Sequence, residues 1–312
     1  MIGLLFVDKP VGMTSHDVVD RVRRRLGTRA IGHAGTLDPG ASGLLVLAIG
    51  AATRCVAVWQ SGDKTYEGAI RFGVVTDSQD LMGKVLEERP VTVDEAMIRA
   101  ASDAMLGETA QLPPMVSAVR VGGERLHRLA RRGIEVDRTP RTITVHSWEW
   151  LSFELPLARF RIHCGKGTYV RTLAHDLGQT LGCGAALAAL RRTGSAPFDL
   201  ARAIPAGELR TLSAAEVWAR AGLPLDQALK VLPWVPVEAE AAEEIGFGRA
   251  VPVGDEARGA APVGAGPRSI VITGADGALL ALGELAEVAA GFEARPHLVF
   301  PWAVRSGRRS VA

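Results

Sequence analysis

Asp38 is the single carboxylate in the glycine-rich stretch AIGHAGTLDPGASGLLVLAIG, residues 30–50. Pro39 disfavours the helical region for Asp38 and pushes it towards an extended conformation. The surrounding glycines permit positive φ angles and close approach of another backbone. The pattern predicts a loop that presents one carboxylate rigidly to a bulky ligand. Asp-Pro-Gly is also an ordinary turn, in which Asp38 would only cap the backbone.

Two further stretches contain side chains that could work with such a carboxylate. KTYEG contains Tyr66, and CGKGTYVRT contains Tyr169 and Arg171; the two tyrosines are the only ones in the chain. A guanidinium favours the ionised form of a neighbouring carboxylate, and a tyrosine offers a flat ring with a polar tip. The glycine run is not a phosphate-binding loop, because Gly167 stands where that motif requires Ser or Thr. Thr168 is expected to cap the helix that follows.

The elements that must position these groups are a mixture of strands and helices. GLLFVDKP and GLLVLAIG are typical of buried strands, and LARFRIHCGKGTYVRTLAHDLGQTLG predicts a strand, a glycine turn and a helix. MTSHDVVDRVRRRLG predicts an amphipathic helix that begins at Thr14 or Ser15 and ends at Gly27. Because the order is not a regular βαβ repeat, the expected class is α+β, a mixed or antiparallel sheet flanked by helices.

The chain of 312 residues is predicted to form two domains, 1–233 and 234–312. Two prolines lie close together near residues 232–235, and the sequence beyond them predicts a small β-rich domain. A Gly/Ala/Pro-rich segment near residues 254–267 predicts a loop of unassigned function. The first domain holds 29 basic and 24 acidic residues and the second holds 7 and 10, so the excess positive charge belongs to the first.

The composition argues against several classes of protein. Three cysteines without a CxxC pair argue against a disulfide scaffold and suit a reducing compartment. The seven histidines show no metal-ligand spacing, so no metal site is expected. The longest apolar stretch, residues 43–52, is about half a membrane span, and the initial apolar run is too short for a signal peptide. We therefore expect a soluble, cytoplasmic protein.

Arginine is concentrated in two segments of the first domain. Residues 21–25 place a basic face opposite the apolar stripe of the first predicted helix. Residues 120–141 hold seven arginines against three acids, four of them expected on a short helix: Arg125, Arg128, Arg131 and Arg132. Each segment could be an ordinary solvated helix face. Together they are typical of a surface that binds nucleic-acid phosphates.

These segments resemble a known enzyme family. The resemblance lies in LLFVDKPVGMTSHDVVDRVRR, GHAGTLDPGASGLLVLAIGAATR, KTYEGAIRFGVVTDSQD, PPMVSAVRVGGERLHRLARRGIEV and CGKGTYVRTLAHDLGQTLGCGAALAALRRTGSAPF. In this order, over about residues 3–200, they are similar to the bacterial tRNA pseudouridine synthase B family, the tRNA pseudouridine-55 synthases. The segment after Trp234 resembles, more weakly, the PUA-type RNA-binding domain that ends many members. Val116 and Arg120 depart from the family's usual Tyr and Lys.

The resemblance implies a pseudouridine-synthase fold and the isomerisation of a T-loop uridine, position 55 of tRNA, to pseudouridine. The base leaves C1′, turns and rejoins through C5, without a cofactor or metal. The family's nucleophile falls on Asp38, the tyrosine beneath the base on Tyr66, and the arginine paired with the nucleophile on Arg171. Loss of the base builds positive charge at C1′, which a fixed carboxylate can stabilise or trap. Attack at C1′, attack on the base and a glycal route all stay open.

The resemblance also implies how the RNA is held. The target nucleotide must be flipped out of the folded T-loop, and an insertion near residues 113–140 would grip the RNA. Further contacts are implied by the resemblance or expected from charge and aromatic character: His33, Tyr169, Leu190, Lys9, Lys64, Arg128 and Arg132. The expected partner is the T-arm stem-loop of tRNA. No membrane and no obligate protein partner are implied, and the protein is expected to be a monomer.

Two other interpretations stay open at this point. The first is a non-catalytic tRNA-binding or chaperone protein, against which the presence of Asp38, Tyr66 and Arg171 argues. The second is a nucleoside hydrolase, which also uses carboxylates at C1′ but would release free uracil. The sequence lacks the aspartate cluster that would hold the metal of such a hydrolase.

Overall fold

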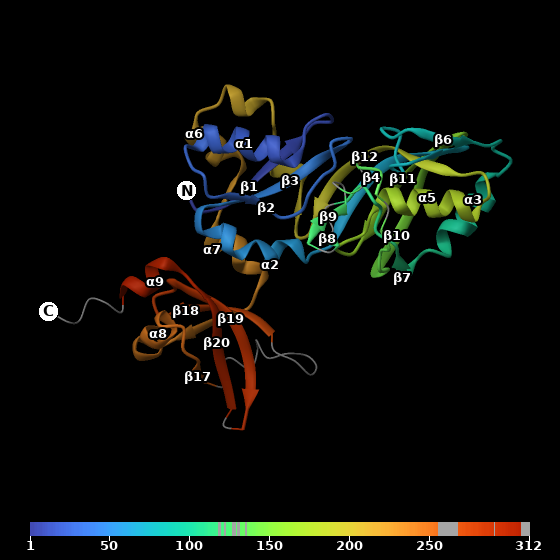
Figure 1. Ribbon diagram of the computed structural model, residues 1–312. Helices are drawn as coiled ribbons and strands as arrows, with labels where there is room; N and C mark the ends of the chain where they lie inside the picture. The colour runs from blue at the N-terminus through green and yellow to red at the C-terminus, as the bar shows by residue number, and fades with distance from the viewer. Residues whose placement is uncertain are drawn as a thin grey trace.

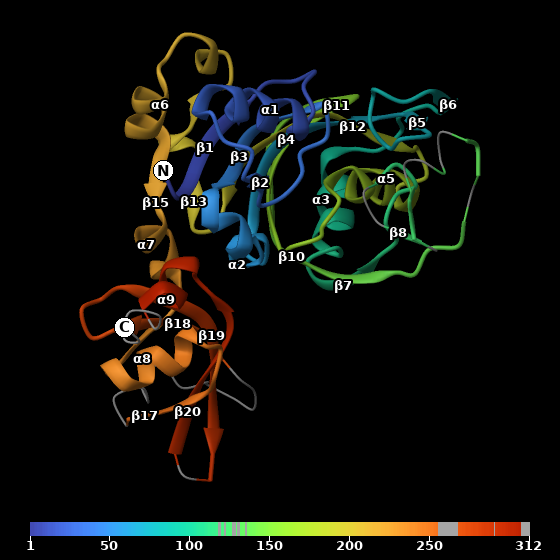
Figure 2. The same ribbon diagram turned by 60° about the vertical axis from the view of Figure 1, so that its left-hand side comes forward.

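The computed structural model describes residues 1–117, 120–121, 123–126, 129, 132–134, 136–254, 268–289 and 291–306. Within them the chain forms a large mixed sheet with helices on its faces and a separate five-stranded sheet near the C-terminus. Figures 1 and 2 show the small sheet beside the end of the large sheet that carries β1 (Gly3–Lys9), away from β7 (Gly107–Gln111). The predicted α+β class with a β-rich C-terminal domain is confirmed.

The large sheet has eleven strands, in the main order β14-β1-β3-β12-β4-β11-β10-β7, with β2, β13 and β15 paired beside this path. The pairs β12–β3 and β14–β1 are parallel, and the others are antiparallel. The remaining strands are β2 (Ile31–His33), β3 (Ala41–Ile49), β4 (Lys64–Phe72), β10 (Arg141–Glu154), β11 (Leu157–Cys164), β12 (Ala185–Ser195), β13 (Phe198–Asp199), β14 (Ile204–Pro205) and β15 (Gly222–Pro224). Two small hairpins are β5 (Val74–Thr76) with β6 (Val85–Glu88) and β8 (Arg120–Val121) with β9 (Glu124–Arg125).

Helices cover both faces of the large sheet. They are α1 (Ser15–Leu26), η1 (Gly50–Cys55), α2 (Val56–Gln60), α3 (Glu95–Asp103), α5 (Val170–Thr180), η2 (Leu200–Arg202), η3 (Glu208–Arg210), α6 (Ala214–Ala221), α7 (Leu225–Ala228) and η4 (Leu229–Val231). Because strand side chains alternate, Leu5 and Leu45 pack against α1, whereas Phe6 and Leu44 pack against α2 and α7. In both views α1 and α2 lie on opposite sides of β1 and β3. At the other end, α3 and α5 cover β4, β10 and β11.

The first helix forms as its sequence predicts. The Thr14 hydroxyl accepts from the Asp17 N–H (3.1 Å), and the Asp17 carboxylate accepts from the Thr14 N–H (2.8 Å). This reciprocal capping box satisfies two otherwise unpaired backbone donors. Gly27 ends the helix in the left-handed region, with φ 64°. The helix is thus fixed at both ends by its own sequence.

β12 joins the two halves of the large sheet because it pairs with both β3 and β4. Its contact with β3 runs from Leu190 opposite Ala41 to Arg192 opposite Gly43. Gly43 has φ +104°, and a Cβ there would lie 2.2 Å from the Arg192 carbonyl oxygen. Any side chain at this position would force the strands apart. The glycine-rich stretch therefore packs against β12 as well as presenting Asp38.

The C-terminal sheet is ordered β16-β18-β19-β20-β17. Its elements are β16 (Trp234–Val237), α8 (Ala239–Gly246), β17 (Val251–Val253), β18 (Arg268–Gly274), β19 (Leu279–Val288), β20 (Gly291–Val299) and α9 (Pro301–Ser306). Val271 and Phe300 share one buried cluster with Leu4 and Trp59, and Arg54 Nη1 donates to the Val299 carbonyl (2.8 Å). The two sheets therefore share apolar packing. Residues 255–267 of the predicted loop lie outside the described residues.

No helix in the described ranges is both long enough and apolar enough to cross a membrane.

Candidate active site

Asp38 lies in the loop between β2 and β3, and hydrogen bonds hold this loop on both sides. The Ser15 hydroxyl, at the start of α1, accepts from the Leu37 N–H (2.8 Å) and bonds the Leu37 carbonyl (3.0 Å). The Gly12 N–H donates to the Pro39 carbonyl (2.8 Å). The Asp38 side chain between them is 47% exposed. A fixed backbone thus presents an accessible carboxylate.

Arg171, in the first turn of α5, is the cation that faces Asp38. Its side chain is only 5% exposed, and Nη1 lies 3.4 Å from Asp38 Oδ2 and 3.7 Å from Asp80 Oδ2. Nη2 donates a short hydrogen bond to the Val116 carbonyl. The structure therefore brings Asp38 and Arg171 together, and it fixes the guanidinium from more than one direction.

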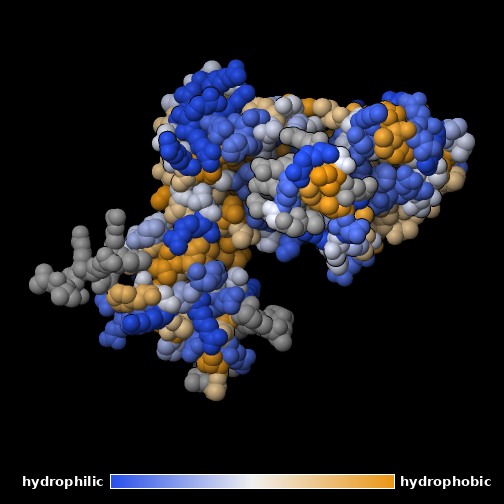
Figure 3. Space-filling model, in the orientation of Figure 1, coloured by the Kyte–Doolittle hydropathy of each residue, from blue (hydrophilic) through white to orange (hydrophobic). Residues whose placement is uncertain are grey.

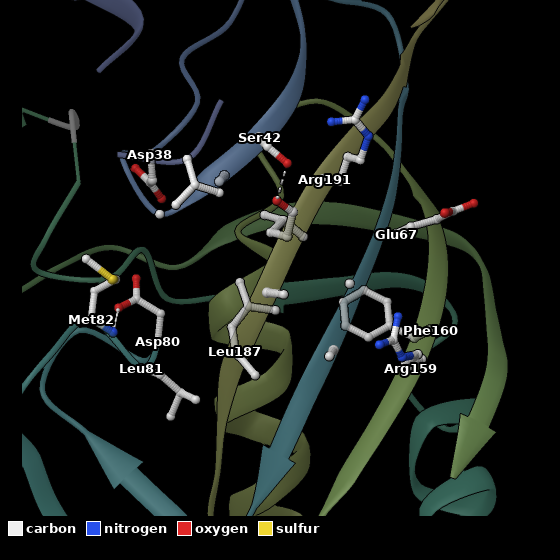
Figure 4. Close-up of a pocket in the computed structure, with 18 of the residues that line it drawn as sticks. Asp38, Ser42, Glu67, Asp80, Leu81, Met82, Arg159, Phe160, Leu187 and Arg191 are labelled. Atoms are coloured by element: carbon white, nitrogen blue, oxygen red, sulfur yellow. Dashed lines mark hydrogen bonds between the residues drawn. The ribbon is translucent and has the colours of Figure 1, made fainter. Parts of the chain in front are cut away.

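Asp80 is a carboxylate of this site that the sequence analysis missed. The Ser78 hydroxyl (2.7 Å) and the Met82 N–H (3.0 Å) both donate to Asp80 Oδ1, so that Oδ2 faces Arg171. Figure 4 shows Asp80 and Met82 near Asp38, with the Asp80–Met82 hydrogen bond dashed. The only local signal was the acidic turn TDSQD, which does not indicate a distant partner.

A buried amide from β7 holds the start of α5. Gln111 Nε2 donates to the Tyr169 carbonyl (3.1 Å), and Gln111 Oε1 accepts from the Tyr169 N–H (2.8 Å). Tyr169 is the N-cap residue, so the prediction that Thr168 caps this helix is wrong. The Thr168 hydroxyl instead donates to the Gly165 carbonyl (2.9 Å) within the glycine turn. The Tyr169 ring centroid lies 5.8 Å from the Arg171 guanidinium carbon, within cation–π range.

Tyr66 lies on β4 and is 9% exposed. Burial raises the pKa of its phenol, whereas the nearby Arg192 guanidinium acts in the opposite direction. Arg192 comes from β12, and its guanidinium donates to the Leu44 carbonyl (2.8 Å) and the Gly35 carbonyl (3.1 Å). Arg192 is the second residue that the sequence analysis missed, although the LRR pattern marked its segment through Leu190.

Two cavities meet at Asp38. The smaller, of about 340 Å³, is lined among others by Lys64, Tyr66, Tyr169, Arg171 and Arg192. The larger, of about 530 Å³ and shown in Figure 4, is lined among others by Val11, Leu81, Met82, Leu157 and Arg159. Both are lined by Asp38, Ala41, Leu187 and Leu190. Among the residues that the structure describes, no three His, Cys, Asp or Glu side chains are grouped as metal ligands.

Lys9 does not fit its expected role as an RNA contact. Its side chain is completely buried, and the ammonium donates to the Pro10 carbonyl (3.0 Å) and the Met13 carbonyl (2.7 Å). Burial lowers the pKa of Lys9 to about 8, and the charge of Asp38 opposes that shift. Lys9 therefore holds the segment of residues 10–13, whose Gly12 N–H bonds the Asp38 loop, and its buried ammonium is not placed to contact a phosphate.

Lys64 and His33 are placed differently from each other. Lys64 lines the smaller cavity, and burial, followed by the charge of Arg192, lowers its pKa to about 8. His33 lies on β2 and precedes Ala34, which lines the smaller cavity, but His33 itself lines neither cavity. Its Nδ1 is buried without a hydrogen-bond partner among the described residues, and burial lowers the pKa of the imidazole.

The arginine-rich insertion is described in part. Arg125 lies on β9, a strand of a hairpin, so its expected place on a helix is wrong. Arg132 is exposed, with Nη2 2.8 Å from Glu124 Oε2. Arg128 and Arg131 lie outside the described residues.

The chain is similar in sequence to a known enzyme family. Residues 23–170 match the model of the TruB family pseudouridylate synthase (N terminal domain), and residues 171–230 match the tRNA pseudouridylate synthase B C-terminal domain. The chain is 53% identical over 227 residues to a tRNA pseudouridine synthase B from Opitutus terrae, covering 72% of this chain and 94% of the relative. It is 44% identical over 254 residues to that of Syntrophotalea carbinolica, covering 80% and 81%.

A solved structure extends the similarity to the whole fold. One chain of a crystal structure of a Cbf5-Nop10-Gar1 complex superposes with a TM-score of 0.71 at 28% identity, covering 96% of this chain and 84% of that one. The match includes both sheets, since it spans nearly all of the chain. From these sequence matches, the chain belongs to the TruB family of pseudouridylate synthases, which are isomerases.

Proposed function

We propose that this protein converts a uridine in the T-loop of tRNA, at position 55, to pseudouridine, with Asp38 as the nucleophile. The observation that carries the proposal is the pairing of Asp38 with Arg171, 3.4 Å apart, where two cavities meet. The reaction class follows from the family. The tRNA substrate is supported by the names of the relatives, tRNA pseudouridine synthase B.

The side chains lie where this reaction would develop charge. As the N-glycosidic bond breaks, positive charge grows at C1′ of the ribose, and the Asp38 carboxylate stabilises or traps it. Arg171 orients that carboxylate, and Asp80 together with the Val116 carbonyl holds Arg171. A carboxylate that is oriented before the RNA arrives needs little rearrangement in the transition state.

The smaller cavity receives the flipped uridine in this proposal. Its volume of about 340 Å³ lies within the range of small-molecule sites, and Leu187 and Leu190 provide apolar walls. Rejoining the base through C5 requires a base that removes the C5 proton, and we assign this role to Tyr66. Tyr66 acts as the phenolate and becomes the neutral phenol when it accepts the proton. Because burial raises the pKa of this phenol, the phenol must first lose its own proton to solvent, and the Arg192 guanidinium stabilises the resulting phenolate.

The rest of the chain would hold the tRNA. Residues 1–233 form the catalytic domain in this proposal, and residues 234–312 form a PUA-like domain that binds RNA outside the T-loop. The insertion near residues 113–140, with Arg132 and Arg128, grips the T-arm. The protein acts as a cytoplasmic monomer without a protein partner.

Replacing Asp38 tests the proposal. Asp38→Asn keeps the shape of the side chain but not its charge, so release of tritium from C5-labelled uridine in tRNA should fall by about 10³-fold or more. Affinity for tRNA should stay within about tenfold, or 1.4 kcal/mol. The matched control is Asp103→Asn, an exposed carboxylate on α3, which should retain full activity.

Three outcomes would contradict parts of the proposal. Near-normal tritium release by Asp38→Asn would remove the nucleophile role. Tight tRNA binding by the unaltered protein without tritium release would favour a non-catalytic tRNA-binding or chaperone protein. Free uracil as the product would indicate a nucleoside hydrolase.

A further inference from the structure

Four arginines surround a hollow at the far end of α1, away from the Asp38 loop. The hollow, of about 490 Å³, is lined by Arg21, Arg24, Arg25, Leu209 and Arg210, and we name it the arginine hollow. Its walls come from α1 and from η3, which are far apart in the sequence. Figure 3 shows hydrophilic residues gathered in blue over the α1 and α6 region, at the upper left. No acidic residue lines the hollow.

The positive charge of the arginine hollow is not neutralised by the protein. In the described part of the chain, none of its four arginines forms an ion pair with a carboxylate. The neighbouring acids are already engaged: Asp20 pairs with Arg23, and Glu208 pairs with Arg220. Four guanidiniums around one concavity repel one another unless an anion lies between them.

The arginine hollow is also built with a fixed wall. Arg25 Nε donates to the Leu209 carbonyl (2.7 Å), and Nη2 donates to the Arg210 carbonyl. These bonds join α1 to η3 and hold one guanidinium in place. On an ordinary solvated helix face the charges belong to one helix, whereas the four arginines of the arginine hollow come from two elements. Because its walls come from two elements, the arginine hollow is better explained as a binding site than as an ordinary solvated surface.

α1 connects the arginine hollow rigidly to Asp38. At the start of the helix, Ser15 bonds both the N–H and the carbonyl of Leu37, the neighbour of Asp38. The helix has 12 residues, so its two ends lie about 18 Å apart at 1.5 Å per residue. The buried side chains of Val18 and Val22 keep it packed on the sheet. The distance from the Asp38 loop to the arginine hollow is therefore fixed.

We propose that the arginine hollow binds a phosphodiester of the substrate RNA, about one helix length from the nucleotide that meets Asp38. This inference rests on the proposed function, because it assumes an RNA bound at Asp38. The ligand chemistry is a phosphate group held by planar guanidiniums, which bind phosphate oxygens in pairs. α1 then acts as a spacer that favours RNA whose backbone passes both sites at once.

The test replaces three of the arginines and leaves Arg25, which bonds the protein backbone. The variant is Arg21→Gln/Arg24→Gln/Arg210→Gln. The matched control, Arg89→Gln/Arg99→Gln/Arg161→Gln, removes the same charge from arginines that already pair with glutamates. The dissociation constant for tRNA is measured from low to high salt. We expect it to rise about fivefold or more at low salt, and the salt slope to fall by about one for each lost phosphate contact.

A variant with the same affinity and salt slope as the control would overturn the proposal. Thermal melting shows whether the triple variant folds, and Arg24→Gln alone replaces it if it does not, with a smaller effect in the same direction. Tritium release at saturating tRNA should be unchanged. If the unaltered protein releases no tritium, the proposed function fails. The salt slopes of tRNA binding then still show whether the arginine hollow binds RNA phosphate. An effect on whole tRNA but not on an isolated T-arm places the phosphodiester outside that arm; an effect on both places it within.

Discussion

The first domain contains arginines of two kinds, buried beside Asp38 and exposed at the arginine hollow. Arg171 and Arg192 are 4% and 2% exposed, and each has fixed oxygen partners in the protein. Arg24 and Arg210 are exposed and have no carboxylate partner among the described residues. Burial makes the geometry of an arginine decisive, because each lost partner stays unsatisfied. An exposed arginine contributes mainly its charge, which salt can screen.

The same conservative substitution, arginine to lysine, at both places tests whether burial separates the two kinds of arginine. Lysine retains the charge but has a compact ammonium that cannot reach Asp38, Asp80 and the Val116 carbonyl at once. We expect Arg171→Lys to lower the single-turnover rate of tritium release about 100-fold, roughly 2.7 kcal/mol. Affinity for tRNA and its salt slope should change little.

The control for this prediction is Arg24→Lys in the arginine hollow. Because that site contributes charge to an exposed surface, the rate and the salt slope should both stay within about twofold of the unaltered protein. Equal losses of rate at the two positions would show that burial does not separate the two kinds of arginine.

The sequence predicted features that depend on local chain geometry. Asp38 stood out because proline and glycine restrict or free the backbone around it, although the same residues also form an ordinary turn. The helix start was narrowed to Thr14 or Ser15, and the structure places the cap at Thr14. The strand and turn pattern beyond Trp234 also predicted a second, β-rich sheet, because strands and turns have local signals. These features need no knowledge of distant pairing.

The missed residues depend on contacts between distant segments. Arg192 reaches the site because β12 runs beside β3, and Asp80 does so because its loop lies on β12, where the Leu81 N–H donates to the Leu187 carbonyl (3.0 Å). Thr168 was predicted as a cap because nothing local indicated Gln111. Charge alone likewise could not reveal that Lys9 is buried. Periodicity reports which face of a segment is buried, not which segment covers it.

Gln111 offers a second test, because it bonds the backbone of Tyr169 at the start of α5 and lines neither cavity at Asp38. Gln111→Met keeps the volume but leaves the Tyr169 N–H without the Gln111 acceptor, and Gln111 is only 3% exposed. The Tyr169 carbonyl loses the bond from Gln111 but still accepts from the Leu173 N–H. We expect the free energy of unfolding to fall by about 1–3 kcal/mol. Tritium release should slow about tenfold, since the first turn of α5 carries Arg171. Denaturant unfolding and single-turnover kinetics measure the two effects.

Gln179→Met, at the exposed end of α5, is the matched control and should change neither quantity appreciably. If Gln111→Met loses stability while its rate per folded molecule is unchanged, Gln111 is structural only and does not position Arg171. Tritium release that slows without any change in the KM for tRNA would support positioning.

Lys64 combines features of both kinds of arginine. It is buried like Arg171, but its effect on RNA binding depends on its charge, which changes with pH. Burial lowers its pKa from 10.5 to about 8. Between these values the unfolded chain binds more protons than the folded one, so the contribution of Lys64 to the free energy of unfolding rises with pH. Affinity for tRNA should move the opposite way, since the cavity loses a positive charge above pH 8.

A Lys64→Arg variant separates these effects, because arginine does not lose its charge in this range. At constant ionic strength, the affinity of the unaltered protein for tRNA should fall roughly threefold more between pH 7 and pH 9 than that of the variant. Lys9, whose pKa is also about 8, is present in both proteins and cancels from the comparison. Lys230→Arg, an exposed position, is the control and should follow the unaltered protein. Identical pH profiles for Lys64→Arg and the unaltered protein would mean that Lys64 does not face the RNA, and that only permanently charged groups of the cavity attract it.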